Sequence, residues 1–427
     1  MSLLRQIKNN QLFKTGLNYS LVGSVNSFAG MAVGLLIMRW LTPIELGLWN
    51  AVSIFQAYIP FFQLGIQSGL NRDLPVLLGK GDVESAKTLV ANAKGYSLIM
   101  SFLFVFAGIF LSLYFYIVGK DLSFVLGVFT IALIAATTSQ TLHLVATFRS
   151  SKSFDKLTKI MILDTIMILL LVAFIYKYHY YGILIYNGVK YTMYSLLMTY
   201  FSPYRKLKPQ LKFKTLLNLS KTGLILMSFI QMRGIAQSIP RWLILYLGGV
   251  VKLGLFSPAL AINGVMTMLP SQIAQFFHPQ MGYKYGQTGN AKDMWPYIKK
   301  MLIIFPLLSL AVCLAFWFIA PWLLSTFFPK YTDSLWAMRI MAIAFVFSSA
   351  FTTHGVLYTI KAYKPAYLFS ISELVGSFLF PYLVVHFFKS DLLASITIGL
   401  SINNFLLYIL NTLILRRVLF LSKYNLS

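Results

Sequence analysis

The long apolar stretches of this chain constrain its fold more than any other feature. A helix that crosses the roughly 30 Å hydrocarbon layer of a bilayer needs about 20 mostly apolar residues. Hydrophobic residues make up 58% of the 427 residues, and charged residues only 11%. The sequence therefore predicts an all-α polytopic membrane protein and excludes a soluble enzyme. Twelve transmembrane helices are expected, at residues 16–40, 47–70, 95–118, 122–147, 160–177, 182–201, 222–247, 253–277, 301–324, 334–358, 365–388 and 392–415.

The basic residues are concentrated in every second connection between the predicted helices. The chain has 36 Lys and Arg residues against 11 Asp and Glu residues, a formal charge of +25. Most of the bases precede the first helix or follow an even-numbered one. Positively charged connections stay on the cytoplasmic side of a membrane. Both chain ends are therefore predicted to be cytoplasmic, and the charge does not indicate a nucleic-acid partner. The largest connections, 71–94 and 278–300, are expected to form short surface helices, such as Val83–Ala93.

Three short patterns occur twice along the chain, in the same order. In the first pair, Gly47 corresponds to Gly254. Each half contains six predicted helices, so the halves share one orientation, which indicates a parallel repeat about an axis along the membrane normal. We expect an N-terminal lobe at residues 1–210 and a C-terminal lobe at 211–427. The paired segments are Leu41–Trp49 with Leu247–Phe256, Pro75–Lys87 with Pro279–Lys292, and Thr147–Lys152 with Thr359–Lys364.

Residue types that would indicate a metal, a cofactor or catalysis are few. The single cysteine, Cys313, lies in an apolar run, and the five histidines are scattered without a pair at helical spacing. No phosphate-binding loop of the GxxxxGK[ST] type occurs. The sequence predicts no metal site, no cofactor and no ATP hydrolysis, and the outer connections are too short for the catalytic loop of a membrane-bound glycan polymerase or ligase.

Ionisable residues inside the predicted spans are the best candidates for a functional site, because a charge at the bilayer centre costs about 2.5–3.5 kcal/mol on insertion scales. Arg233, Gln237 and Arg241 are spaced at i, i+4 and i+8, so they share one helix face, beside Pro240, which could kink the helix. Guanidinium groups bind phosphate or carboxylate through planar, paired donors. These residues predict an anion site, although ion pairs with Glu373 or Asp164 would also explain the arginines.

Four further charged residues have two interpretations each. Lys190 and Arg339 are candidates to line the same cationic cavity, or to reach the headgroups with their long side chains. Glu373 is a candidate proton or sodium carrier, since a buried carboxylate can exchange protons during transport, or a structural partner for an arginine. Asp164 has the same two roles open and lies near a cytoplasmic helix end, where water could hydrate it.

Two motifs carry a resemblance that covers most of the chain. They are R-W-L-T-P-x-E-L-G-L-W at Arg39–Trp49 and P-x-x-x-G-x-G-D at Pro75–Asp82. With the twelve spans and a first helix rich in small residues, the chain resembles the polysaccharide transporters of the multidrug/oligosaccharidyl-lipid/polysaccharide exporter superfamily, in particular the O-antigen flippases. The resemblance implies a V-shaped fold of two lobes.

The same resemblance implies a function. Such a protein moves undecaprenyl-diphosphate-linked oligosaccharide repeat units from the cytoplasmic to the outer leaflet of the bacterial inner membrane. Alternating access is the expected mechanism, and the polysaccharide polymerase machinery is a candidate partner. The coupling ion (H+ or Na+), the sugars carried and the product, O-antigen of lipopolysaccharide or another surface glycan, stay open.

An ion-coupled multidrug antiporter of the same superfamily is the alternative. Such antiporters usually depend on an acidic residue in the first helix, and the predicted first helix has none. A net-positive interior would also repel a cationic drug. Both features favour the flippase.

Overall fold

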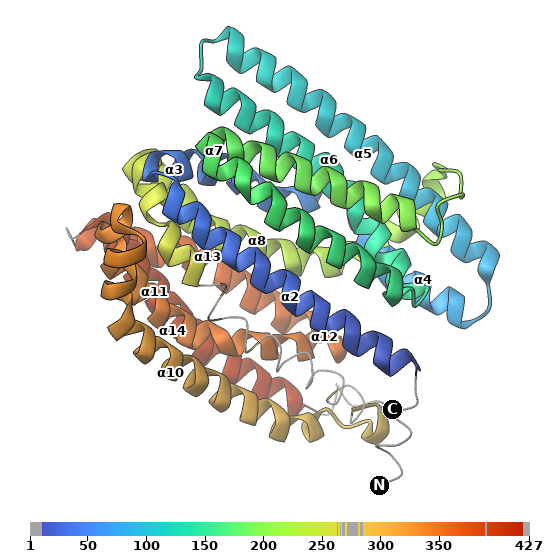
Figure 1. Cartoon of the computed structure of the whole chain (residues 1–427). Helices are drawn as coiled ribbons and strands as arrows, with labels where there is room; N and C mark the ends of the chain where they lie inside the picture. The colour runs from blue at the N-terminus through green and yellow to red at the C-terminus, as the bar shows by residue number, and fades with distance from the viewer. Residues whose placement is uncertain are drawn as a thin grey trace. The chain divides into compact units, whose positions relative to one another are not determined.

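The computed structural model describes residues 11–262, 264, 266, 270, 281, 285–388 and 391–421, and in this part of the chain every regular element is a helix (Figure 1). Within the described residues, nine helices are long and apolar enough to cross a membrane. The prediction of an all-α multi-pass membrane protein is confirmed. The elements are α2 (Gln11–Trp40), α3 (Pro43–Ser53), η1 (Ile54–Gln63), α4 (Ile66–Gly79), α5 (Val83–Ile117), α6 (Leu122–Ser150), α7 (Phe154–Phe201), α8 (Phe213–Leu255), η2 (Ala291–Met294), α10 (Trp295–Phe327), η3 (Pro329–Ser334), α11 (Leu335–Ser348), η4 (Ser349–Gly355), α12 (Val356–Thr359), α13 (Tyr363–Phe387) and α14 (Leu392–Leu419).

The longest element, α7, contains two of the predicted spans. Its 48 residues would extend about 72 Å as a straight helix, more than twice the hydrocarbon thickness. The helix breaks at His179, where φ is 50° and ψ is −117°. A Cβ at Gly182 would lie 2.2 Å from the carbonyl oxygen of Phe174, so the chain reverses tightly at the break. The spans expected at 160–177 and 182–201 lie on either side of it.

The second predicted span, 47–70, is divided among α3, η1 and α4. Pro60 lies in the 3-10 segment η1, where a missing N–H is tolerated better than in a regular helix interior. Leu64 and Gly65 both have positive φ, and α4 begins at the next residue. This broken segment is not among the nine spans of the described residues. Of the span expected at 253–277, residues 263, 265, 267–269 and 271–277 lie outside the described residues. The twelve-helix prediction is consistent with the structure.

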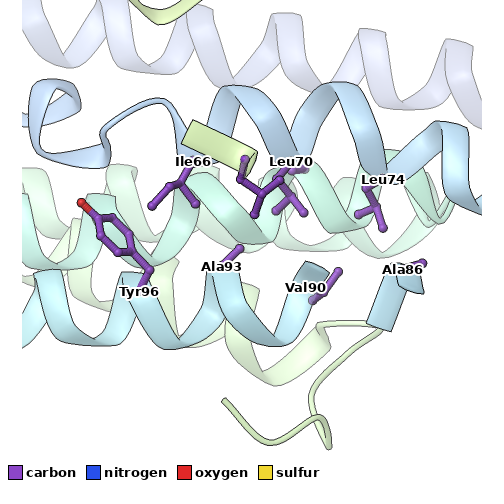
Figure 2. Packing of buried hydrophobic residues seen from close by; sticks show 9 residues of the cluster. Ile66, Leu70, Leu74, Ala86, Val90, Ala93 and Tyr96 are labelled. Carbon is purple, nitrogen blue, oxygen red and sulfur yellow. The ribbon is translucent and has the colours of Figure 1, made fainter. Parts of the chain in front are cut away.

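The separate surface helix expected over Val83–Ala93 does not form. These residues are the first three turns of the continuous, 35-residue helix α5. The cause is a buried contact with α4, in which Leu70, Leu74 and Val90 are all at most 1% exposed. Figure 2 shows these side chains facing one another across the two helices. Apolar burial, rather than the membrane surface, therefore holds this segment in place.

The chain divides into two compact units, each of which contains two separate segments of the sequence. The first unit contains residues 1–41 and 52–231, and the second contains residues 42–51 and 232–427. Helix α8 passes from the first unit to the second, and most of α3 belongs to the second. The lobe boundary expected at residues 210 and 211 stays a prediction.

The turns between helices support the repeat. Gly81 and Gly289 have φ of 76° and 67°, a region that favours glycine. The next residue caps a helix in each case: Asp82 accepts from the amide of Ser85 at 3.0 Å, and Asn290 accepts from the amide of Lys292 at 3.0 Å. Hydrogen bonds from Ser85, its side chain first and its amide second, lower the pKa of Asp82. The P-x-x-x-G-x-G-D motif therefore marks the end of α4 and the start of α5.

A second pair of turns corrects the alignment of the repeat. Lys152 and Lys361 both have φ of 55°, and the amide after each one bonds to a carbonyl five residues earlier, at 2.9 and 2.8 Å. This is the pattern of a helix C-terminus with a left-handed residue. The equivalent residues are therefore Lys152 and Lys361, whereas the sequence alignment paired Lys152 with Lys364. The backbone geometry, and not the position of the lysines along the sequence, identifies the equivalent residues.

Repeat-related residues also contact each other within the second unit. A Cβ at Gly47 would lie 2.0 Å from the carbonyl oxygen of Val250, and one at Gly254 would lie 1.7 Å from that of Pro43. Asn50 donates to the hydroxyl of Ser257, 207 residues away, at 2.8 Å. Glycine is required at this crossing because the two backbones approach closely. The first predicted pair of repeat segments therefore meets at this crossing.

Candidate functional site

The second unit contains an intramembrane cavity of about 130 Å³. It lies among α8, α11, α13 and α14, and its lining mixes aromatic and aliphatic residues with a small number of polar ones. A pocket of this composition is typical of small-molecule and cofactor sites. The polar residues of its lining are Arg233, Gln237, Ser348, Glu373, Ser377, Asn403 and Asn404.

Arg233 and Glu373 form an ion pair in this cavity. The Nε atom of Arg233 lies 3.8 Å from the Oε1 atom of Glu373. Glu373 is 8% exposed, whereas 45% of the Arg233 side chain is accessible. The pair explains how a carboxylate is tolerated inside the membrane. Because a guanidinium has five N–H donors, the contact through Nε leaves donors of Arg233 available to a ligand.

Gln237 lines the same cavity one helical turn from Arg233, and both side chains are exposed. Arg241 is half-buried and does not line the cavity. Pro240 lines the cavity, and α8 continues through it, with its non-helical residue at Gly249. Of the three residues predicted on one helix face, the structure brings two to the cavity.

Two adjacent asparagines of α14, Asn403 and Asn404, line the cavity and were not predicted from the sequence. Asn403 is 3% exposed, and a Cβ at Gly376 of α13 would lie 2.0 Å from its Oδ1 atom. Asn404 donates to the carbonyl of Ala344 in α11 at 3.0 Å. An Asn-Asn pair within an apolar span is a detectable signal, because intramembrane amides need hydrogen-bond partners.

Lys190 and Asp164, both from α7, line a different cavity in the first unit. Asp164 is 5% exposed, and its hydration near a helix end stays a prediction. Asn26 of α2 donates to its Oδ2 atom at 3.0 Å. The ammonium group of Lys190 lies 5.8 and 5.6 Å from the ring centroids of Tyr186 and Tyr191, and does not extend away from the protein.

Arg339 lines neither cavity. Its Nε and Nη2 atoms donate to the carbonyl of Trp317 at 3.1 and 2.9 Å. The guanidinium also lies 5.1 and 5.5 Å from the rings of Trp317 and Trp336. These contacts fix α11 against α10, as expected of a structural arginine.

A metal centre is not formed by the side chains that the structure describes. Among them, no group of three His, Cys, Asp or Glu residues is arranged to hold an ion.

The arrangement of helices is that of a known class of membrane transporter. An inward-facing multidrug resistance MATE family transporter of the MOP superfamily matches with a TM-score of 0.72 and 17% identity, over 92% of this chain and 94% of that one. An outward-facing transporter of that class matches with a TM-score of 0.65 and 18% identity, over 96% and 95%. A MATE structure in complex with MaD3S gives 0.65 and 19%, also over 96% and 95%.

The family follows from the sequence itself. The profile of the polysaccharide biosynthesis protein family matches residues 36–323, which is more than half of the chain. The chain belongs to this family, and its fold is similar to that of the solved MATE transporters. A comparison with curated protein sequences gave no match.

Proposed function

We propose that the chain is a flippase for an undecaprenyl-diphosphate-linked oligosaccharide. The observation that carries the proposal is the cavity with Arg233 and Gln237, inside a membrane protein of the polysaccharide biosynthesis family. Arginine suits a diphosphate because its planar donors match two phosphate oxygens. The polyprenyl chain stays in the lipid while the polar headgroup crosses.

The ion pair gives the anion site a means of release. With Glu373 charged, the Arg233–Glu373 pair is close to neutral, and a diphosphate competes with the carboxylate for the guanidinium. With Glu373 protonated, Arg233 is unpaired within the cavity and attracts the anion more strongly. Protonation of Glu373 would therefore favour loading, and its loss would favour release, which makes the proton the first coupling ion to test and sodium the second.

The cellular setting is part of the same proposal. The distribution of basic residues supports a cytoplasmic location for both ends of the chain, and the proposed substrate class supports a location in the bacterial inner membrane. Alternating access moves the headgroup outward for O-antigen or another surface glycan, and the polymerase machinery would receive the product.

Export in cells that lack their own flippase tests the proposal. We expect the wild-type chain to restore surface glycan, Arg233→Ala to reduce export at least tenfold, and Gln237→Ala to reduce it less. Arg72→Ala is the matched control, because Arg72 pairs with Asp73 at 2.7 Å and is 54% exposed, outside the cavity. Full export by Arg233→Ala at normal protein levels would exclude Arg233 as the anion site.

A multidrug antiporter is the second candidate. The fold shared with MATE transporters and the buried Glu373 favour it, because an intramembrane carboxylate can bind a cation. Drug resistance conferred by the wild-type chain, without restored glycan export, would support this candidate and contradict the flippase.

A further inference from the structure

The cavity of the first unit has features that the anion site does not explain. Its volume is about 190 Å³, room for about six water molecules at roughly 30 Å³ each. It is formed by α2 and by the α7 segments on both sides of the break at His179. Its lining residues are Asn26, Met161, Asp164, Lys190, Tyr191 and Tyr194.

Asp164 has acceptor capacity that the protein does not use. Its Oδ2 atom accepts from Asn26 at 3.0 Å, and the same amide donates to the hydroxyl of Thr165 at 2.9 Å, which fixes its orientation. The Oδ1 atom of Asp164 is buried and accepts no hydrogen bond from a described residue. A buried polar atom without a partner costs about 1–3 kcal/mol, so a donor from a bound molecule would stabilise this site.

Lys190 faces the same cavity without pairing with Asp164. Among the described residues, no carboxylate oxygen lies within 4.0 Å of its ammonium group, which is held against two tyrosine rings instead. The hydroxyls of Tyr191 and Tyr194 make no hydrogen bond to a described residue. The ammonium group and the two tyrosine hydroxyls thus belong to side chains that line one space with Asp164.

The opposite charges decide what this space can hold. A metal cation is disfavoured by the ammonium group of Lys190, and an anion is disfavoured by the carboxylate of Asp164. A neutral molecule with several hydroxyls satisfies both, because it donates to Asp164 and accepts from Lys190. The tyrosine rings offer apolar faces for its C–H groups.

We infer that this cavity binds one sugar ring of the transported glycan, through hydroxyl groups bridging Asp164 and Lys190. The inference rests on the proposed function, and it adds the recognition of sugar by the first unit.

Binding of lipid diphosphates to the purified full-length protein tests the assignment. The probes are undecaprenyl diphosphate alone and the same lipid carrying a hexose, an N-acetylhexosamine or a 6-deoxyhexose. We expect at least one sugar to improve the affinity of the wild-type protein tenfold or more. Asp164→Asn and Lys190→Met should abolish that gain and leave the affinity for undecaprenyl diphosphate unchanged, whereas Arg233→Gln should weaken both forms.

The control and the contrary outcomes are defined by the structure. Lys177→Met removes a lysine from the same helix, 5.3 Å from the Tyr178 ring and outside the cavity, and should keep the gain from sugar. Tyr191→Phe serves as a milder variant if Asp164→Asn does not fold. A gain that survives in all cavity variants would overturn the sugar site. So would loss of pH-dependent export in Asp164→Asn with sugar binding intact, which would make Asp164 a proton carrier. A wild-type protein that binds no lipid diphosphate would refute the flippase itself.

Discussion

The ion pair between Arg233 and Glu373 can be measured by a cycle of Arg233→Gln, Glu373→Gln and the double variant. Two unit charges 3.8 Å apart attract by about 4 kcal/mol at an effective dielectric constant of about 20. Since 45% of the Arg233 side chain is exposed, screening reduces this attraction, and we expect a coupling free energy of about 2 kcal/mol. That energy corresponds to roughly a 30-fold change in the unfolding equilibrium constant.

The two single variants should differ in size. Arg233→Gln is expected to be the more destabilising, because it leaves Glu373 buried without its partner, whereas Glu373→Gln leaves Arg233 half exposed. The free energy of unfolding in detergent, followed by tryptophan fluorescence during denaturant titration, measures both. If the effects of the single variants add in the double variant within about 0.5 kcal/mol, the pair contributes nothing and the reasoning is refuted.

Export separates stability from function in the same three variants. If Arg233 serves only to neutralise Glu373, the double variant should recover both stability and export. If Arg233 binds the diphosphate, the double variant should recover stability and remain defective in export. We expect the second result, and a fully active double variant would contradict the anion site.

Three further predictions concern other positions. Gly254→Ala should destabilise the protein by about 1–3 kcal/mol, because its Cβ would lie 1.7 Å from the carbonyl oxygen of Pro43. Gly34→Ala, with nothing within 4 Å, should instead be neutral or stabilising in the same thermal-unfolding assay. Arg339→Lys should lower the melting temperature, because an ammonium group cannot keep the paired donation to one carbonyl, while diphosphate affinity stays unchanged. Asp82→Ala should be destabilising at neutral pH. The pKa of Asp82 is lowered in the folded protein, so its capping contribution is present above the ordinary value of 3.8. The contribution is lost as the pH falls through the folded pKa. At low pH, the unfolding of Asp82→Ala should therefore not differ from that of the wild type.

Apolar length and charge placement were sufficient to predict the helices, because a bilayer leaves few alternatives to an uninterrupted apolar helix. The sequence also separated the two spans of α7, whose break at His179 follows a Lys-Tyr pair. It could not show that Val83 begins a continuous α5, since that depends on burial against α4. The same limit applies to Lys361, whose turn geometry, rather than its charge, makes it equivalent to Lys152.

The candidate sites were predictable residue by residue but not as groups. An ionisable residue in an apolar span is visible in the sequence, and this criterion found Arg233, Glu373, Asp164 and Lys190. Two of the partners come from helices distant in sequence, because Glu373 lies 140 positions after Arg233 and Asn26 lies 138 positions before Asp164. Arg339 satisfied the same criterion and instead holds a backbone carbonyl, because carbonyl-binding and ligand-binding arginines look alike until their neighbours are known.

The crossing of α3 and α8 bears on how such a chain can arise. Gly47 and Gly254 are repeat partners, as are Asn50 and Ser257, and members of the two pairs lie against one another. A contact in which equivalent positions meet is what a two-fold axis produces between identical subunits. If the two halves descend from one duplicated gene, this crossing preserves the dimer interface of the ancestral six-helix protein. Before the fusion, one substitution changed the glycine in both subunits, so both sides of the crossing had to accommodate it. After the fusion, each glycine could be substituted separately.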